Sequence, residues 1–328
     1  MTDSLVDGFG RVHRSLRVSV TDRCDLRCTY CMPAAGLDWL AASERLTVEE
    51  TLRAVAVAVG LGITKVRLTG GEPLLAPGLL PVVRGIAALD LRPDIALTTN
   101  GTRLTTLAVP LRAAGVSSVT VSLDTLREDR FALLTRRRGL GRVLAGIEAA
   151  VAAGLVVKAN AVLRRGTNDD EVLDLLGHCV ERGIELRFIE TMPLNPDGSW
   201  DRAAMVTGQE VLDTVSGAYG LTPTSRGSRP AERWLLDGGP AAVGVIRSVS
   251  APFCAACDRL RLTSDGQLRA CLFSSTEYDL RALLRDPTTT PLALAELFRD
   301  CLRGKRAAHD IGAPGFRQPA RAMSAIGG

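Results

Sequence analysis

The chain has 328 residues, 46% of them hydrophobic and 23% charged, so it can bury a substantial core in one large domain or two smaller ones. Its net charge of +4 is a mild excess, which argues against a nucleic-acid-binding protein and fits a local pocket for an acidic ligand better. The longest apolar run, 54–63, is too short to span a bilayer and MTDSLVDGFGR lacks a signal-peptide pattern, so we expect a cytoplasmic protein without a membrane partner.

Short β-like runs alternate with helical patterns from the start of the chain. Strands are predicted over 16–20, 65–69, 95–99, 118–123, 156–163 and 185–190. Helices are predicted over 47–60, 79–90, 104–114, 142–153 and 169–182, the first of them with Thr47 and Glu50 at capping-box spacing. Successive βα units of this size predict a parallel sheet with right-handed crossovers.

The pattern changes after the sixth strand. Residues 193–208 are rich in Pro, Asn, Asp and Gly, so we expect the barrel to stay open there. A helix over 210–216, a hairpin joining 259–263 to 267–271, two helices and a loose tail are predicted to follow. The predicted fold class is α/β: an incomplete, open (β/α)6 TIM-like barrel over 1–192, with a C-terminal α+β region over 193–328 covering the barrel mouth.

Polar motifs follow most of the predicted strands. Cys24 follows the first strand, and the motifs TGGEP (69–73), TTNG (98–101), SLD (122–124) and ETMP (190–193) lie at the ends of four others. In parallel α/β architectures the loops after the strands form the active face. We therefore expect the chemistry of this chain to gather at one mouth of the barrel.

Three cysteines, Cys24, Cys28 and Cys31, follow the first strand at the spacing C-x3-C-x2-C. Structural zinc takes four ligands, usually in paired C-x2-C units, and neither a histidine nor an aspartate makes an obvious fourth ligand close by. A redox C-x-x-C motif would not explain the upstream cysteine. The spacing favours an iron–sulfur cluster held by three thiolates.

A second triplet, Cys254, Cys257 and Cys271, can converge because the predicted hairpin ends at its last cysteine. Zinc remains an alternative for this triplet, although none of the three histidines, His13, His178 and His309, is near it in the sequence. Two sites that each lack a fourth ligand suggest that the open position is functional, since an iron with a free position can bind a small molecule. Cys179 and Cys301 continue apolar helical patterns and are interpreted as core residues.

The sequence contains only three lysines, Lys65, Lys158 and Lys305, among its 40 basic residues. A lysine kept in so arginine-rich a chain is either needed as a compact ammonium or present by chance. Lys65 with Arg67, and Arg259 with Arg261, alternate as residues on one face of a strand do.

Cys24-x3-Cys28-x-Tyr30-Cys31, followed by Gly70-Gly71-Glu72-Pro73, resembles the radical S-adenosylmethionine (SAM) superfamily. The second triplet, Arg259 with Arg261 and the ending MSAIGG narrow the resemblance, from about Arg11 to Gly328, to the GTP 3′,8-cyclase family of molybdenum cofactor biosynthesis. The resemblance implies a lyase that converts GTP to (8S)-3′,8-cyclo-7,8-dihydroguanosine 5′-triphosphate. A 5′-deoxyadenosyl radical made from SAM abstracts hydrogen from C3′, and the C3′ radical attacks C8 of the guanine.

The resemblance also implies the cofactors and the partners. Two [4Fe–4S] clusters and SAM are expected, together with GTP as substrate, an electron donor, a homodimer and a downstream molybdopterin-pathway enzyme that receives the product. Cys24, Cys28 and Cys31 would hold the cluster that binds SAM. Cys254, Cys257 and Cys271 would hold the auxiliary cluster, whose open iron faces the guanine.

Further roles are implied residue by residue. SAM would be contacted by Tyr30, Gly71, Ser122 and Met192. GTP would be bound by Arg17, Lys65, Arg67, Thr98, Lys158, Arg187, Arg259 and Arg261 and by the backbone around Leu260. Gly327 and Gly328 would reach into the site and support catalysis.

Two other interpretations of the chain stay open. One is another radical SAM enzyme with an auxiliary cluster, such as a peptide-maturing enzyme, and the other is a zinc-stabilised module without catalytic activity. The arginine run 136–138 is interpreted as a solvated loop.

Overall fold

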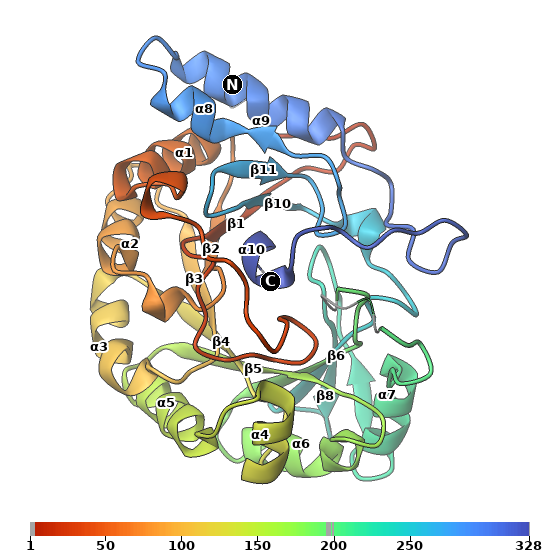
Figure 1. Cartoon of the computed structure of the whole chain (residues 1–328). Coiled ribbons are helices and arrows are strands. Elements are labelled where there is room, and N and C mark those ends of the chain that lie inside the picture. The colour runs from red at the N-terminus through yellow and green to blue at the C-terminus, as the bar shows by residue number, and fades with distance from the viewer. Residues whose placement is uncertain (1–3, 195–197, 199, 328) are drawn as a thin grey trace.

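Six parallel strands form the centre of one curved sheet (Figure 1). They are β1 (Ser15–Ser19), β2 (Lys65–Thr69), β3 (Asp94–Thr99), β4 (Ser118–Ser122), β5 (Val156–Val162) and β6 (Glu185–Ile189). The structure is a computed structural model that describes residues 4–194, 198 and 200–327. The six predicted strands are confirmed, and each of their ends differs from the prediction by one residue at most.

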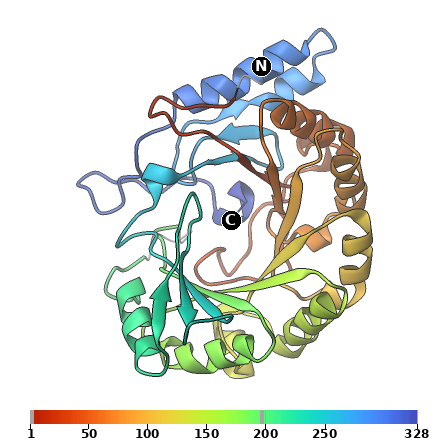
Figure 2. The ribbon, with the colours of Figure 1, turned by 180° about the vertical axis from the view of Figure 1, so that it is seen from behind.

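Helices cover the outer face of the curved sheet, as the two opposite views show (Figures 1 and 2). They are α1 (Val48–Gly60), α2 (Leu79–Ala87), α3 (Leu104–Ala114), α5 (Leu140–Ala152) and α6 (Val172–Val180), with the short 3-10 turns η1 (Ala42–Glu44), η2 (Pro73–Leu75) and η3 (Asp169–Glu171). The predicted capping box starts α1, since the Thr47 hydroxyl accepts from Glu50 N at 3.1 Å and Thr47 N donates to the Glu50 carboxylate at 2.8 Å. One further helix, α4 (Glu128–Thr135), was not predicted.

The core lies between the helices and the outer face of the sheet. On β1, Leu16 and Val18 point into this core, and Arg17 between them has the opposite direction because successive side chains of a strand alternate. Val66 and Leu68 of β2 repeat the pattern. The inner face of the sheet is thereby left to polar and charged side chains.

The C-terminal region extends the sheet at both edges. At one edge β9 (Ala242–Ile246) pairs parallel with β6 and is followed outward by β8 (Glu232–Leu236) and β7 (Leu221–Pro223). At the other, β10 (Arg259–Leu262) pairs parallel with β1 and is followed by β11 (Gln267–Arg269) and β12 (Tyr278–Asp279). The predicted hairpin is confirmed as β10 and β11 but is shorter, and the sheet ends at β7 and β12 without closing into a barrel.

The remaining helices are α7 (Gly208–Ser216), α8 (Leu280–Arg285), α9 (Pro291–Arg303) and α10 (Met323–Ile326). The short α10 lies in the centre of the curved sheet (Figure 1). Ser324 and Ile326 are buried there, so the prediction of a loose tail is wrong for 323–327. No helix among the described residues combines the length and apolarity needed to cross a membrane.

Candidate active site

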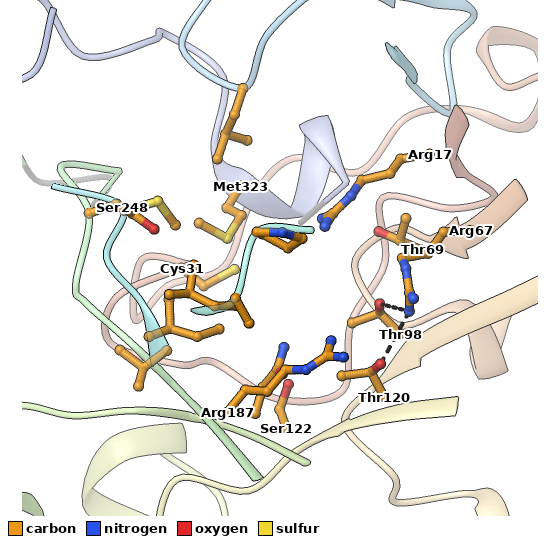
Figure 3. Close-up of a pocket in the computed structure, with 18 of the residues that line it drawn as sticks. Arg17, Cys31, Arg67, Thr69, Thr98, Thr120, Ser122, Arg187, Ser248 and Met323 are labelled. Carbon is orange, nitrogen blue, oxygen red and sulfur yellow. Dashed lines mark hydrogen bonds between the residues drawn. The ribbon is translucent and has the colours of Figure 1, made fainter. Parts of the chain in front are cut away.

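A cavity of about 490 Å³ lies on the inner face of the curved sheet. Its wall contains residues of all six central strands and of the C-terminal region. Arg17, Arg67 and Arg187 extend from three of these strands toward the same space (Figure 3). The six cysteines of the two triplets line the cavity as well, so the structure brings together the residues that the sequence places far apart.

The first triplet lies in the loop after β1. Arg27 N donates to Thr135 O and Thr29 N donates to Leu134 O, both at 2.9 Å, which fastens this loop to the end of α4. The helix that the sequence analysis missed is therefore the support of the first cysteine loop.

The side chain of Arg136 also holds the first cysteine loop. Its guanidinium donates to the carbonyl oxygens of Arg27 and Met32 at 3.0 Å each. The interpretation of 136–138 as a solvated loop is therefore wrong for Arg136, whereas Arg137 and Arg138 are exposed.

The first triplet has an apolar setting. Burial raises the pKa of Cys24 to about 12 and that of Cys31 to about 11, and it raises the pKa of Cys28 as well. A free thiolate is disfavoured in such surroundings, so deprotonation of these thiols would accompany metal binding.

The second triplet has a cationic setting. Cys254 begins η4 (Cys254–Ala256), and Cys271 follows β11. Arg259 Nη2 lies 3.5 Å from Cys257 Sγ, and Lys305 Nζ lies 3.7 Å from the same sulfur. Burial acts to raise the pKa of Cys257, but these two cations outweigh it and lower that pKa to about 7.

Both triplets have the donor chemistry of iron–sulfur sites, because all six cysteines are free thiols that face one cavity. Among the described residues, no three His, Cys, Asp or Glu side chains are close enough together to ligate a single metal ion. In a cluster each thiolate ligates its own iron, so a cluster does not require such a group. The residues present fit two clusters held by three thiolates each.

The four residues expected to contact SAM line the cavity. Among them, Tyr30 donates its hydroxyl to Asp124 Oδ2 at 2.6 Å, and Asp124 Oδ1 accepts from Val162 N at 2.8 Å. Burial raises the pKa of Asp124 to about 6. Asp124 was missed as a site residue, although its place in the SLD motif at the end of β4 was the signal that could have found it.

Gly71 lets two loops meet backbone to backbone. Gly71 N donates to Thr21 O at 2.8 Å, and a Cβ at Gly71 would lie 2.4 Å from the carbonyl oxygens of Asp22 and Arg23. No side chain fits in this space. The chain's own loop before Cys24 is thus a reason for glycine here, in addition to the expected approach of SAM.

Glu72 connects this region to the loop after β3. Its buried carboxylate accepts from Thr99 Oγ1 at 2.7 Å and from Asn100 N at 2.6 Å, and burial raises its pKa to about 7. Asn100 in turn donates to Asp25 at 2.7 Å and lies 3.9 Å from Cys24 Sγ. Both motifs were placed at the mouth from the sequence, but Glu72 and Asn100 were given no role.

Three arginines of the expected GTP set stand side by side on adjacent strands. Parallel pairing aligns Arg17 of β1 with Arg261 of β10 on one side and with Arg67 of β2 on the other. Burial and the charges of Arg261, Arg259 and Arg67 hold the pKa of Arg17 well below its usual value. Arg17 has no hydrogen bond or ion pair with any residue that the structure describes. This part of the wall is therefore strongly cationic.

The guanidinium of Arg67, unlike that of Arg17, has hydrogen-bond partners. It donates to the hydroxyls of Thr98 and Thr120 at 3.2 Å each (Figure 3), and burial followed by the charge of a nearby arginine lowers its pKa to about 10. Lys65, the first residue of β2, pairs with Asp94 at 2.9 Å. Thr98, another residue of the expected GTP set, thus lies directly beside Arg67.

Glu185 is a carboxylate among cations. It pairs with Arg187 at 2.7 Å, with Arg233 at 3.1 Å and with Lys158 at 3.7 Å. Burial and then the charge of Arg187 lower the pKa of Lys158 to about 8. Arg233 and Glu185 also line the cavity, and the sequence had no signal for them.

Three predicted site residues remain: Leu260, Gly327 and Gly328. The Leu260 side chain is buried in the hydrophobic core, so only its backbone remains available to a ligand. Gly327 is within the site, since Arg261 donates to its carbonyl oxygen. Gly328 lies outside the described residues.

The fold and the cysteine loop define a class, and comparison with known proteins identifies it. The family model for the radical SAM superfamily matches residues 18–179, and the model for Molybdenum Cofactor Synthesis C matches residues 184–311. Among solved structures, Streptococcus suis SuiB bound to S-adenosylmethionine has a TM-score of 0.62 at 15% identity, covering 86% of this chain and 68% of that one. A likeness at that identity concerns the fold alone.

Two curated relatives narrow the class. The GTP 3′,8-cyclase of Streptomyces coelicolor is 54% identical over 99% of this chain and 96% of its own length. GTP 3′,8-cyclase 2 of Mycobacterium tuberculosis is 51% identical over 100% of this chain and 93% of its own length. The chain belongs to the GTP 3′,8-cyclase family of radical SAM enzymes.

Proposed function

We propose that this chain converts GTP to (8S)-3′,8-cyclo-7,8-dihydroguanosine 5′-triphosphate in molybdenum cofactor biosynthesis, with SAM as the source of a 5′-deoxyadenosyl radical. Membership of the GTP 3′,8-cyclase family supports the reaction. Family membership favours a GTP cyclase over a peptide-maturing radical SAM enzyme and over a zinc-stabilised module.

The row formed by Arg261, Arg17 and Arg67 is the observation that carries the proposal. Adjacent strands are about 4.8 Å apart, and like charges side by side on a sheet repel each other. The arrangement is destabilising unless an anion enters the cavity. A triphosphate supplies several negative oxygens, and arginine forks bind such oxygens in pairs.

The SAM side and the GTP side of the cavity are neighbours. Asn160 of β5 pairs with Ser122 of β4 on one side and with Arg187 of β6 on the other. Ser122 belongs to the proposed SAM contacts and Arg187 to the proposed GTP contacts. The strand order would therefore place the two ligands next to each other in one cavity, as hydrogen transfer from one to the other requires.

Cys24, Cys28 and Cys31 would hold the first cluster, and Tyr30, Gly71 and Met192 would complete the SAM site with Ser122. When bound, that cluster supplies the electron that cleaves SAM. The residues of the chain then act by position: they orient C3′ of GTP, neutralise the triphosphate and shelter the radical from water.

The C-terminal region, 193–328 in the proposed division of the chain, would complete the site. Its cysteines, Cys254, Cys257 and Cys271, would hold the second cluster beside the guanine. Arg259 and the backbone of Leu260 would contact GTP from the same side. Gly327 and Gly328 would support catalysis, with Gly327 acting through Arg261. Lys65, Thr98 and Lys158 would bind GTP from the central strands.

The reaction also needs partners. We propose an electron donor, a homodimer, a cytoplasmic location and transfer of the product to the next enzyme of the molybdopterin pathway.

The experiment is anaerobic turnover with GTP deuterated at C3′, SAM and a strong reductant. We expect 5′-deoxyadenosine that depends on GTP and carries the deuterium. Formation of deoxyadenosine without label transfer would refute the proposed step. Zinc in place of iron and sulfide in the purified protein would refute both the GTP cyclase and the other radical SAM enzyme as hypotheses.

A further inference from the structure

Lys305 is the one of the three lysines that has no place in the proposed GTP site. It follows α9, and its side chain is buried, with 6% of the residue exposed. Its ammonium donates to the carbonyl oxygens of Arg259 and Ala270 at 2.8 Å each. These carbonyls lie close in sequence to Cys257 and Cys271, so one ammonium ties together the two segments that carry these cysteines.

The charge of Lys305 lacks a carboxylate partner among the described residues, since its contacts are two carbonyl oxygens and Cys257 Sγ, 3.7 Å away. Burying an ammonium without a counter-charge costs several kcal/mol. Anionic sulfur is the compensation that this position offers.

Lys305 contacts the second triplet but is not part of the cavity wall. Cys257, Cys271 and Arg259 line the cavity, and Lys305 does not. Arg259 can therefore turn to a bound nucleotide, whereas the charge of Lys305 stays with the cysteines whether or not GTP is bound.

The position of Lys305 is fixed by its neighbours. Arg11 donates to Cys254 O at 2.6 Å, to Ala307 O at 2.8 Å and to Arg306 O at 2.8 Å. Arg11 itself pairs with buried Asp7 at 2.6 Å. The segment that carries Lys305 is thus fastened to the start of the second triplet.

We propose that Lys305 is a positioning residue that compensates the charge of the second cluster and raises its reduction potential. The inference rests on the proposed function, since it needs a cluster at Cys254, Cys257 and Cys271. A cluster with three thiolates is anionic, and reduction adds one further negative charge. A fixed cation beside it therefore stabilises the reduced form more than the oxidised form.

The test is an EPR-monitored redox titration of the reconstituted full-length protein, with the second-cluster signal identified by its loss in Cys254→Ser. We expect Lys305→Met to keep its iron and to show a lower midpoint potential for this signal. Lys305→Arg, which keeps the charge, is expected to stay close to the parent protein. Arg306→Met is the matched control, because it removes the same charge one residue away at an exposed position, where solvent screens it.

An unchanged midpoint potential in Lys305→Met would overturn the inference. Should Lys305→Met instead fail to assemble the second cluster, Lys305→Arg decides the result. If Lys305→Arg keeps the cluster, the charge of Lys305 is what the cluster needs. If both variants lose the cluster, Lys305 acts through packing and the inference is overturned. Absence of a second cluster from the parent protein would instead refute the proposed function.

Discussion

Replacing Arg17 by methionine should stabilise the protein without GTP and weaken its binding of GTP. Arg17 faces the charges of Arg261, Arg259 and Arg67 and has no anionic partner among the described residues. At a partly hydrated wall, each repulsion over several Å is worth roughly 0.5–1 kcal/mol. Methionine keeps much of the packing of the arginine stem, so after a packing loss of about 1 kcal/mol we expect a net gain of about 1 kcal/mol in the free energy of unfolding.

The effect on the ligand has the opposite sign. A hydrogen bond to a charged group contributes about 1.5–3 kcal/mol, so the dissociation constant for GTP should rise roughly 10- to 100-fold. Urea unfolding without GTP and anaerobic calorimetry with GTP measure the two effects.

Arg53→Met is the matched control for this prediction. Arg53 lies on α1 and donates to Leu284 O at 3.1 Å and to Thr289 O at 2.9 Å, and it does not line the cavity. This variant should lose stability and keep its affinity for GTP. If Arg17→Met behaves in the same way, Arg17 is a structural residue and the argument from the arginine row fails.

Three further predictions concern other parts of the site. Because the pKa of Lys158 is lowered to about 8, its ammonium is charged below that pH and neutral above it, so GTP affinity should fall as pH rises through about 8. Calorimetry should find this fall absent in Lys158→Arg, and its persistence there would exclude Lys158 as the group responsible. Gly71→Ala places a Cβ 2.4 Å from Asp22 O and should displace the first cysteine loop. Its iron content should fall from about eight to about four atoms per chain. Gly177→Ala is the control, because its Cβ meets nothing within 4 Å, and it should keep all of its iron. Cys254→Ser should retain SAM binding and yield no cyclised product, and a loss of SAM binding as large as in Cys24→Ser would contradict the proposed division between the two clusters.

The central strands could be predicted because their signal is local. Leu16, Val18, Val66 and Leu68 alternate with polar residues along their strands, and the same alternation buries them against the helices. Helix α4 was missed because its pattern is weak: Phe131 and Leu134 are buried, but Leu133 between them is largely exposed.

Pairing between distant segments could not be predicted in this way. Nothing local to Arg259 or Arg261 shows that β10 lies beside β1, since the pairing depends on how the whole sheet curves. The cationic set therefore came from the family resemblance, and the alternation of Arg259 with Arg261 indicated only that both side chains share a face. Glu185 and Arg233 had no signal at all, because their ion pair joins β6 to β8 across the sheet.

Buried cations normally have a carboxylate partner, because an unpaired buried charge is destabilising. The arginine row and Lys305 both lack such a partner among the described residues. Such positions persist when a ligand supplies the missing charge. The two sites differ in what can reach them, because the arginine row lines the cavity and Lys305 does not. A soluble anion can reach the first, while anionic sulfur at Cys257 meets the second. It follows that GTP and the clusters should each stabilise the folded chain by mass action. The two stabilisations should be coupled, because Arg259 lies beside Cys257 Sγ and belongs to the proposed GTP contacts, and because Cys257 and Cys271 also favour the charge of Arg261.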